Sequence, residues 1–190
     1  MDKIKLDKTV FLYPMPMTIV GATVDGKPNW LAVAWITPVN YDPLYLGIAL
    51  GRDHHTNRGI IEHGEFSVNI PGTDILADTD YIGMVSGSKV DKSALFPVFN
   101  GVLEHAPMIA DCPVTFECRL VQTVNLPSDE FFIGEVVAAW SEERFLTAGM
   151  PDVRKFRPFT LTMPDNRYWG IGDCVGKAWF AGKERKAKVI

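Results

Sequence analysis

The sequence predicts a mainly β fold, a β-barrel with a few short helices. About eight segments are rich in Val, Ile, Thr and aromatic residues and are bounded by Gly, Pro, Asn or Asp. Helical patterns are short and few by comparison. The chain has 190 residues, 47% of them hydrophobic. This is enough for one sizeable core, so we expect a single domain over residues 1–190.

The first half of the chain predicts four strands, over residues 17–24, 30–37, 44–50 and 65–70. The first two flank DGKPN, which has the residues of a hairpin or a similar tight turn. A polar segment and a short helix, NRGIIEH, lie between the last two. Thr56 is the expected N-cap of that helix, and Gly64 is the expected stop.

The second half begins with a predicted helix over 73–85 and a loop over 86–96 that leads into another short helix, limited by Pro97. Strands are then expected over 114–124, 131–142, 159–163 and 167–171. The two long strands are joined by NLPSD and alternate only partly between apolar and polar residues. Such a pattern is typical of strands covered on both faces, by a closed barrel or by a dimer contact.

Composition excludes several classes of protein. The net charge of −4 gives no overall basic field, which argues against a nucleic-acid binder that works by neutralising phosphates. The longest apolar stretch, residues 30–50, is broken by Pro38, Asn40, Asp42 and Pro43, so it predicts no membrane span. The N-terminus mixes acidic and basic residues and does not look like a signal peptide, so we expect a cytoplasmic protein.

Three cysteines leave at least one thiol unpaired within the chain. Cys112 and Cys118 lie about 20 Å apart if they share one extended strand, which is too far for a disulfide. Buried thiols are the expected state, and a redox role for Cys118 or Cys174 stays open.

The segment GRDHHTNRGI, residues 51–60, suggests two alternative kinds of site. A metal site would need His54 and His55 on one ion, but neighbouring residues point in different directions on a strand or helix. An anion site is the other reading, because a helix start offers backbone N–H groups, and Thr56 and Arg52 could add hydrogen bonds and charge. Thr56 could equally be a simple helix cap beside solvated arginines.

SGSKVDK, residues 86–92, is a second candidate anion contact. Gly87 lets the backbone approach a ligand, serine hydroxyls such as that of Ser86 can hydrogen-bond to it, and Lys89 supplies charge. A solvated loop is the alternative. The S-x-x-K within it lacks the companion motifs of serine hydrolases, and GIGDCVG lacks the spacing and the βαβ unit of a dinucleotide site.

Two tryptophans, Trp30 and Trp35, lie five residues apart and should face opposite sides of a regular strand. One could pack in the core while the other meets a partner or a flat ring.

The order of these features over residues 9–140 resembles the flavin reductase-like family with the FMN-binding split-barrel fold, and within it the flavoredoxin-like members. The segments that carry the resemblance are the hairpin through NWLAVAWIT, GEFSVN, SGSKVDK, PVTFECRLV and FFIGEVV. The resemblance implies a homodimer that holds one FMN per subunit in a groove at or near the interface. His54 and His55 would then be neighbours of the cofactor and not metal ligands.

The same resemblance assigns site residues. It implies that the phosphate is held by Arg52, Thr56, Ser86, Gly87 and Lys89. The isoalloxazine ring would lie along the strand and turn from Ala34 through Trp35 to Thr37. Secondary candidates for cofactor contacts are Asn29, Trp30 and Lys92.

A bound cofactor would carry the chemistry, so no catalytic triad is expected. One function is electron transfer through a retained FMN, with a redox partner protein. The alternative is an NAD(P)H:flavin oxidoreductase that releases reduced FMN. A third is an FMN-binding or assembly protein without turnover. The two candidate phosphate contacts, in residues 51–60 and 86–92, favour retention of FMN by the protein.

Overall fold

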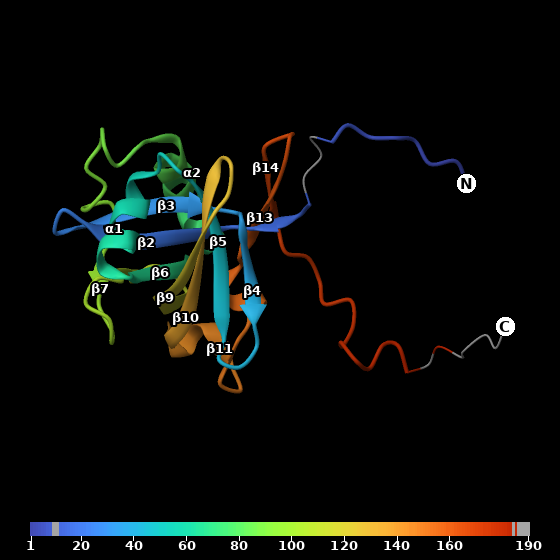
Figure 1. The fold of residues 1–190 in the computed structure, drawn as a ribbon. Helices are drawn as coiled ribbons and strands as arrows, with labels where there is room; N and C mark the ends of the chain where they lie inside the picture. The colour runs from blue at the N-terminus through green and yellow to red at the C-terminus, as the bar shows by residue number, and fades with distance from the viewer. Residues whose placement is uncertain (9–11, 184, 186–190) are drawn as a thin grey trace.

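A seven-stranded antiparallel sheet forms the centre of the computed structural model (Figure 1), which describes residues 1–8, 12–183 and 185. Its strand order is β3-β2-β6-β9-β10-β5-β4. The strands are β2 (Thr18–Val24), β3 (Lys27–Val33), β4 (Ile36–Asn40), β5 (Tyr45–Gly51), β6 (Glu65–Ile70), β9 (Val114–Asn125) and β10 (Asp129–Ser141).

Smaller elements surround this sheet. The helical elements are α1 (His55–His63), η1 (Thr73–Ile75), α2 (Leu76–Met84), η2 (Glu143–Phe145) and α3 (Val153–Phe156). The short strands are β1 (Met15–Pro16), β7 (Val98–Phe99), β8 (Met108–Ile109), β11 (Leu146–Thr147), β12 (Met150–Pro151), β13 (Phe159–Thr162) and β14 (Arg167–Gly170). Strands β1, β13 and β14 form a separate three-stranded sheet. The prediction of a mainly β fold with a few short helices is confirmed. Residues 9–11 of the stretch that carries the family resemblance, and parts of the predicted 1–190 domain, lie outside the described residues.

The sheet curls around one hydrophobic core. Side chains from both ends of the strand order meet there, among them Leu31 of β3, Phe66 of β6, Phe132 of β10 and Ile48 of β5, and all four are buried. Burial of such side chains is the main favourable term in folding, at about 1.5 to 3 kcal/mol each. Among the described residues no ladder joins β3 to β4, so these two strands are the edges of the sheet.

Local sequence explains most element boundaries. Asp25 and Gly26 both adopt positive φ angles, 49° and 75°, which makes the two-residue turn between β2 and β3 that Asp-Gly favours. Gly64 ends α1 in the left-handed conformation, as predicted. Gly59 lets α1 approach β2 closely, since a Cβ atom at this position would lie 2.2 Å from the Thr23 carbonyl oxygen.

Two predicted elements are wrong. The strand expected over 30–37 is two strands, because the chain leaves β3 after Val33 and crosses at Ala34 and Trp35 to β4, at the opposite edge of the sheet. The run of apolar residues gave no local sign of this crossing. The short helix expected within 86–96 is absent, and these residues form turns that are tied to the body by the buried Lys92.

A buried carboxylate fixes the loop that follows β7. Glu117 of β9 is fully buried, and its carboxylate accepts hydrogen bonds from the backbone N–H groups of Val102 and Leu103 at 3.0 and 2.7 Å. The indole N–H of Trp140 donates a third, at 2.8 Å. Three donors therefore compensate for the removal of this group from water.

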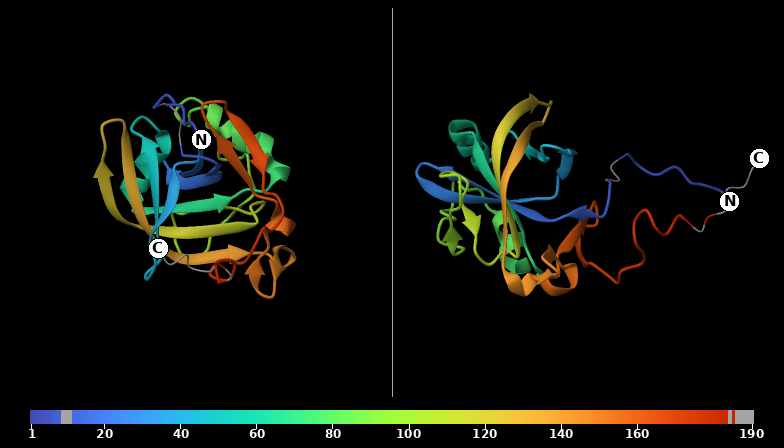
Figure 2. Two further views of the ribbon diagram at one scale, coloured as in Figure 1. Left: turned by 90° about the vertical axis from the view of Figure 1, so that its right-hand side faces the viewer. Right: turned by 90° about the horizontal axis from the view of Figure 1, so that it is seen from below.

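The three cysteines carry free thiols, in agreement with the sequence prediction. Cys112 and Cys118 are buried, and burial raises the pKa of both thiols well above the usual range. Cys174 is exposed on the C-terminal segment after β14, which extends away from the sheet (Figures 1 and 2). No helix in the described part of the chain is long and apolar enough to cross a membrane.

Candidate functional site

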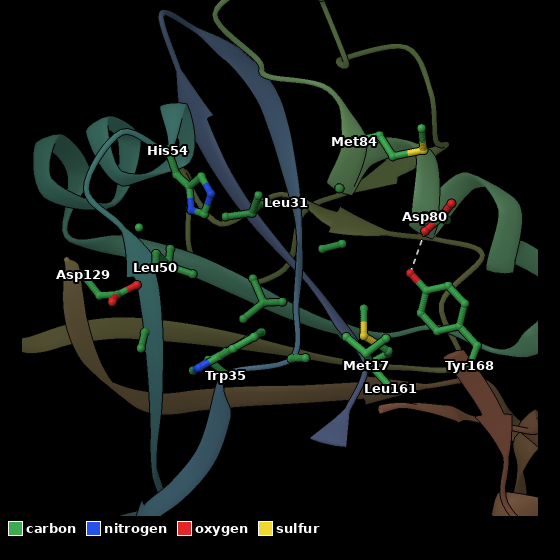
Figure 3. A pocket seen from close by; sticks show the side chains of 16 residues that line it. Met17, Leu31, Trp35, Leu50, His54, Asp80, Met84, Asp129, Leu161 and Tyr168 are labelled. Carbon is green, nitrogen blue, oxygen red and sulfur yellow. Dashed lines mark hydrogen bonds between the residues drawn. The ribbon is translucent and has the colours of Figure 1, made fainter. Parts of the chain in front are cut away.

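A cleft of about 440 Å³ lies between β3 and β5, beside the crossing from β3 to β4 (Figure 3). Its walls are mainly apolar, and the predicted ring contacts Ala34 and Trp35 are among them. Trp35 is 44% exposed, whereas Trp30 is fully buried, but Trp35 lies in the crossing after β3, so the prediction that the two face opposite sides of one regular strand is wrong. The apolar lining further includes Met17, Leu31, Leu50, Met84 and Leu161.

The cleft continues into a polar hollow. A second cavity of about 220 Å³ shares Leu31, His54 and Met84 with the first and is lined by the predicted residues Asn29, Thr56, Ser86, Gly87 and Lys92. Two further hollows adjoin this end, one lined by Lys89 and the other by Arg52. Residues predicted from three separate segments therefore meet along one continuous surface that is apolar at one end and polar at the other.

The start of α1 faces the polar end. The helix N-cap is His54, with no side-chain cap, so the prediction that Thr56 is the cap is wrong. Thr56 is the second helical residue and is buried, and its hydroxyl oxygen accepts a hydrogen bond from the Asn29 side-chain amide at 2.8 Å. This bond ties α1 to β3. The helix thus presents its positive end to the hollow with no side-chain cap and no acidic residue in its first turn.

The loop of residues 86–89 closes the other side of the hollow. The backbone N–H groups of Lys89 and Val90 both donate to the Ser86 carbonyl at 3.0 Å, and the Ser86 and Ser88 hydroxyls lie 2.8 Å apart. Gly87 packs directly on Asn29, since a Cβ atom at this position would lie 2.1 Å from the Asn29 side-chain oxygen. A glycine suits this close approach to Asn29, and its predicted approach to a ligand stays a prediction.

Arg52 and Lys92 both have partners within the protein. The Arg52 guanidinium donates from Nε and Nη2 to the Leu126 carbonyl at the β9–β10 turn, at 3.2 and 2.5 Å. Lys92 is 3% exposed, and its Nζ donates to the carbonyls of Trp30 and Ile82 at 3.0 and 2.7 Å. Each side chain has N–H groups beyond those used in these bonds, and each lines a hollow at the polar end.

Lys92 gives a pH-dependent stability prediction. Burial lowers its pKa from 10.5 to about 8, so the folded chain loses this proton at a lower pH than the unfolded chain does. Between these two values the unfolded state binds more protons, and the free energy of unfolding should therefore rise with pH. Denaturant unfolding at several pH values between about 8 and 10.5 measures this rise. Lys92→Met should abolish it and the exposed-lysine control Lys89→Met should keep it; equal slopes in all three proteins would contradict the prediction.

Two predicted residues lie away from the cavity walls. Thr37 is exposed on β4, where its hydroxyl donates to the Pro38 carbonyl at 3.3 Å. Trp30 packs edge-to-face on Phe96 with ring centroids 5.9 Å apart, in a second core cluster. Its backbone carbonyl accepts from Lys92, so it supports the wall of the hollow from behind.

Sequence reasoning missed the other side of the cleft. Tyr168 of β14 donates a hydrogen bond to Asp80 of α2 at 2.7 Å, and the two side chains lie across the cleft from His54 (Figure 3). Burial, with the Asp80 carboxylate, raises the pKa of Tyr168 to about 12, and burial lowers the pKa of His54. No local motif marks these residues, because α2 and β14 are distant in sequence and meet only in the fold.

The two adjacent histidines do not share a metal centre in the described part of the chain, where no group of three or more His, Cys, Asp or Glu residues could hold an ion. His54 lines the apolar cleft and the polar hollow, whereas His55 lines only the polar side. Both are neighbours of the cleft.

Comparison with known proteins gives matches over the segments that form the polar end of the cleft. A family model described as flavin reductase like domain matches residues 10–160. The structure is similar to flavoredoxin from Methanosarcina acetivorans, with 50% identity, coverage of 96% of this chain and 98% of that chain, and a TM-score of 0.94. Flavoredoxin of Desulfovibrio vulgaris (Miyazaki F) is 30% identical, with 96% and 100% coverage and a TM-score of 0.87.

A curated relative extends the comparison to reductases. The FMN reductase (NADH) RutF of Bradyrhizobium diazoefficiens is 26% identical over 136 residues, which are 66% of this chain and 73% of that protein. The family model covers most of the chain, including β2 to β10 and both polar segments of the cleft. The resemblance drawn from the sequence is confirmed, and the chain belongs to the flavin reductase-like domain family.

Proposed function

We propose that the chain is a flavoprotein that retains FMN in the cleft and transfers electrons through it. The observation that carries this proposal is the continuity of the cleft, which joins an apolar slot to a polar hollow with a helix N-terminus. FMN has the same two parts, a flat apolar ring system and a phosphate. The flavoredoxins to which the chain is similar support a carrier of this kind.

The residues at the polar end fit a phosphate. The uncapped start of α1 offers backbone N–H groups and a positive dipole, and Ser86, Lys89 and Arg52 add hydroxyl and cationic donors. Thr56 lies within this cradle, and Asn29 fixes its position. The close contact between Gly87 and Asn29 keeps the loop against the hollow.

The residues of the slot fit a ring. Leu31, Leu50 and Met17 would exclude water from it, while backbone groups near Ala34 and Trp35 would meet its polar edge. When bound, FMN supplies the redox chemistry by accepting a hydride or electrons and passing electrons on. The protein's own part is to bind, orient and partly desolvate the cofactor.

The finer architecture is part of the same proposal. The curled sheet with unjoined edges is compatible with a split barrel, and the long strands β9 and β10 leave apolar side chains such as Val121 exposed. We therefore propose a homodimer of split barrels in the cytoplasm, where a redox protein would be its partner.

A second function is favoured by the FMN reductase relative. In this alternative the chain is an NAD(P)H:flavin oxidoreductase that reduces FMN and releases it. The difference lies in retention of the cofactor and in reaction with a nicotinamide nucleotide.

One experiment separates the two functions. The purified protein should be yellow, and the flavin released by denaturation should be FMN. Mixed anaerobically with NADH or NADPH, a carrier should keep its flavin oxidised until a redox protein is supplied. Rapid bleaching by either nucleotide without added flavin would favour the reductase, and a colourless protein that binds no added flavin would overturn both.

A further inference from the structure

The C-terminal arm, defined here as residues 171–183, carries large apolar side chains into solvent. Trp179 is 94% exposed, Phe180 57% and Ile171 51%. The arm leads away from the body in Figure 1 and in the right-hand view of Figure 2. Backbone hydrogen bonds within the arm are local, such as those from the N–H groups of Phe180 and Ala181 to the Lys177 carbonyl. Two adjacent exposed aromatic residues on an extended segment are typical of a segment that is buried against a partner.

The charge of the C-terminal end of the sequence, which contains the arm, points to a partner like the chain itself. The arm holds two lysines and one aspartate, a net charge of +1, and the last 20 residues together hold five lysines or arginines and two acidic residues, a net charge of +3. Because the whole chain carries −4, the preceding 170 residues carry −7. A basic segment on an acidic body is attracted to another copy of that body.

A matching surface lies on the edge strand β4 and the turn that follows it. We define the β4 strip as Val39, Tyr41 and Leu44, which are 41%, 94% and 39% exposed. Asp42 is exposed within this strip and would face a basic arm favourably. An apolar sheet edge without lysines is a surface that proteins usually cover. Strand β4 lies on the side of the sheet from which the arm projects (Figure 1).

We propose that the arm of each subunit docks on the β4 strip of a second copy of this chain, so that two subunits exchange arms. In a dimer with a twofold axis the two arm-to-strip contacts form together, because the arm and the β4 strip lie on the same face of each subunit. This proposal rests on the proposed homodimer and adds the segment that holds it together.

Cross-linking through Cys174 tests the contact directly. Cys174 is the exposed cysteine of the arm, and the other two cysteines are buried. We would place a second thiol on the strip with Val39→Cys, mix isotope-labelled and unlabelled full-length chains, and treat them with a short bis-maleimide. The expected product is a covalent dimer whose peptides join position 39 of one copy to Cys174 of the other. Met150→Cys, on β12 and 69% exposed, is the matched control and should not give this product.

The outcomes test the arm exchange, the homodimer and the retention of flavin separately. A chain that sediments as a dimer and forms no link between positions 39 and 174 would overturn the arm exchange and leave the homodimer standing. A link confined to one copy would also overturn it. A monomer that still holds FMN would overturn the dimer and the arm exchange together, with flavin retention intact.

A second variant measures the strength of the contact. Trp179→Ala with Phe180→Ala should raise the dimer dissociation constant by at least about 30-fold, as truncation of aromatic interface anchors does. Both side chains are exposed in the single chain, so the circular dichroism spectrum should not change. Met150→Ala should leave the dissociation constant unchanged. An unchanged constant in the double variant, with slower electron delivery to a redox protein, would assign the arm to that partner instead and overturn the proposal.

Discussion

Replacing Lys89 with alanine should weaken FMN binding by roughly 10- to 150-fold, and replacing Arg52 should have an effect of similar size. A charge-assisted hydrogen bond to the phosphate contributes about 1.5 to 3 kcal/mol, which corresponds to this range. Lys89→Ala is the cleaner test, because Arg52 also donates to the Leu126 carbonyl and its loss would loosen the β9–β10 turn. Riboflavin, which lacks the phosphate, should lose much less affinity.

Titration of the apoprotein with FMN and with riboflavin, followed by flavin fluorescence, measures both affinities. Lys27→Ala is the matched control, since Lys27 lines the same hollow as Lys89 but is paired with Asp91 at 2.7 Å. It should change FMN binding little. Equal losses for the two flavins, or no loss for either, would remove Lys89 and Arg52 from the phosphate site.

Glu117→Ala should lower the free energy of unfolding by about 2 to 5 kcal/mol. The substitution leaves the N–H groups of Val102 and Leu103 and the Trp140 indole without their acceptor, and of these residues Leu103 is buried. It also opens a cavity at a position where Glu117 is fully buried.

Urea unfolding of the variant and of the parent chain gives this difference. Glu62→Ala, on the exposed face of α1, is the matched control for removal of a glutamate and should change stability by less than about 0.5 kcal/mol. A Glu117→Ala protein as stable as the parent would mean that the three donors find other partners.

Local patterns in the sequence were sufficient for most of the fold. Asp-Gly at 25–26 and Gly64 mark ends of elements through backbone conformations that few other residues adopt, so these boundaries were predictable. The crossing at Ala34 and Trp35 was not predictable, because it is set by which strand β4 pairs with and not by the local apolar pattern. Sheet order depends on contacts between distant residues.

The residues of the candidate site also divide into those that local sequence predicts and those set by contacts between distant residues. The loop around Gly87 and Lys89 was a candidate because glycine, hydroxyl and charge occur together in sequence, and it lines the polar hollows. The role of Thr56 as a helix cap was wrong because its hydroxyl is engaged by Asn29, which is 27 residues away. His54 was predicted only as a neighbour of the cofactor. Tyr168 and Asp80 were not predicted as cleft residues, because the two residues that pair are 88 positions apart in the sequence.

The position of the cleft gives it a part in holding the sheet together. It lies between β3, one edge of the sheet, and β5, the neighbour of the other edge, so a molecule bound there touches both ends of the strand order. By thermodynamic linkage, a cofactor bound there would stabilise the folded chain by about 2.7 kcal/mol when its free concentration is a hundredfold above its dissociation constant. In the apoprotein this stabilisation would be absent.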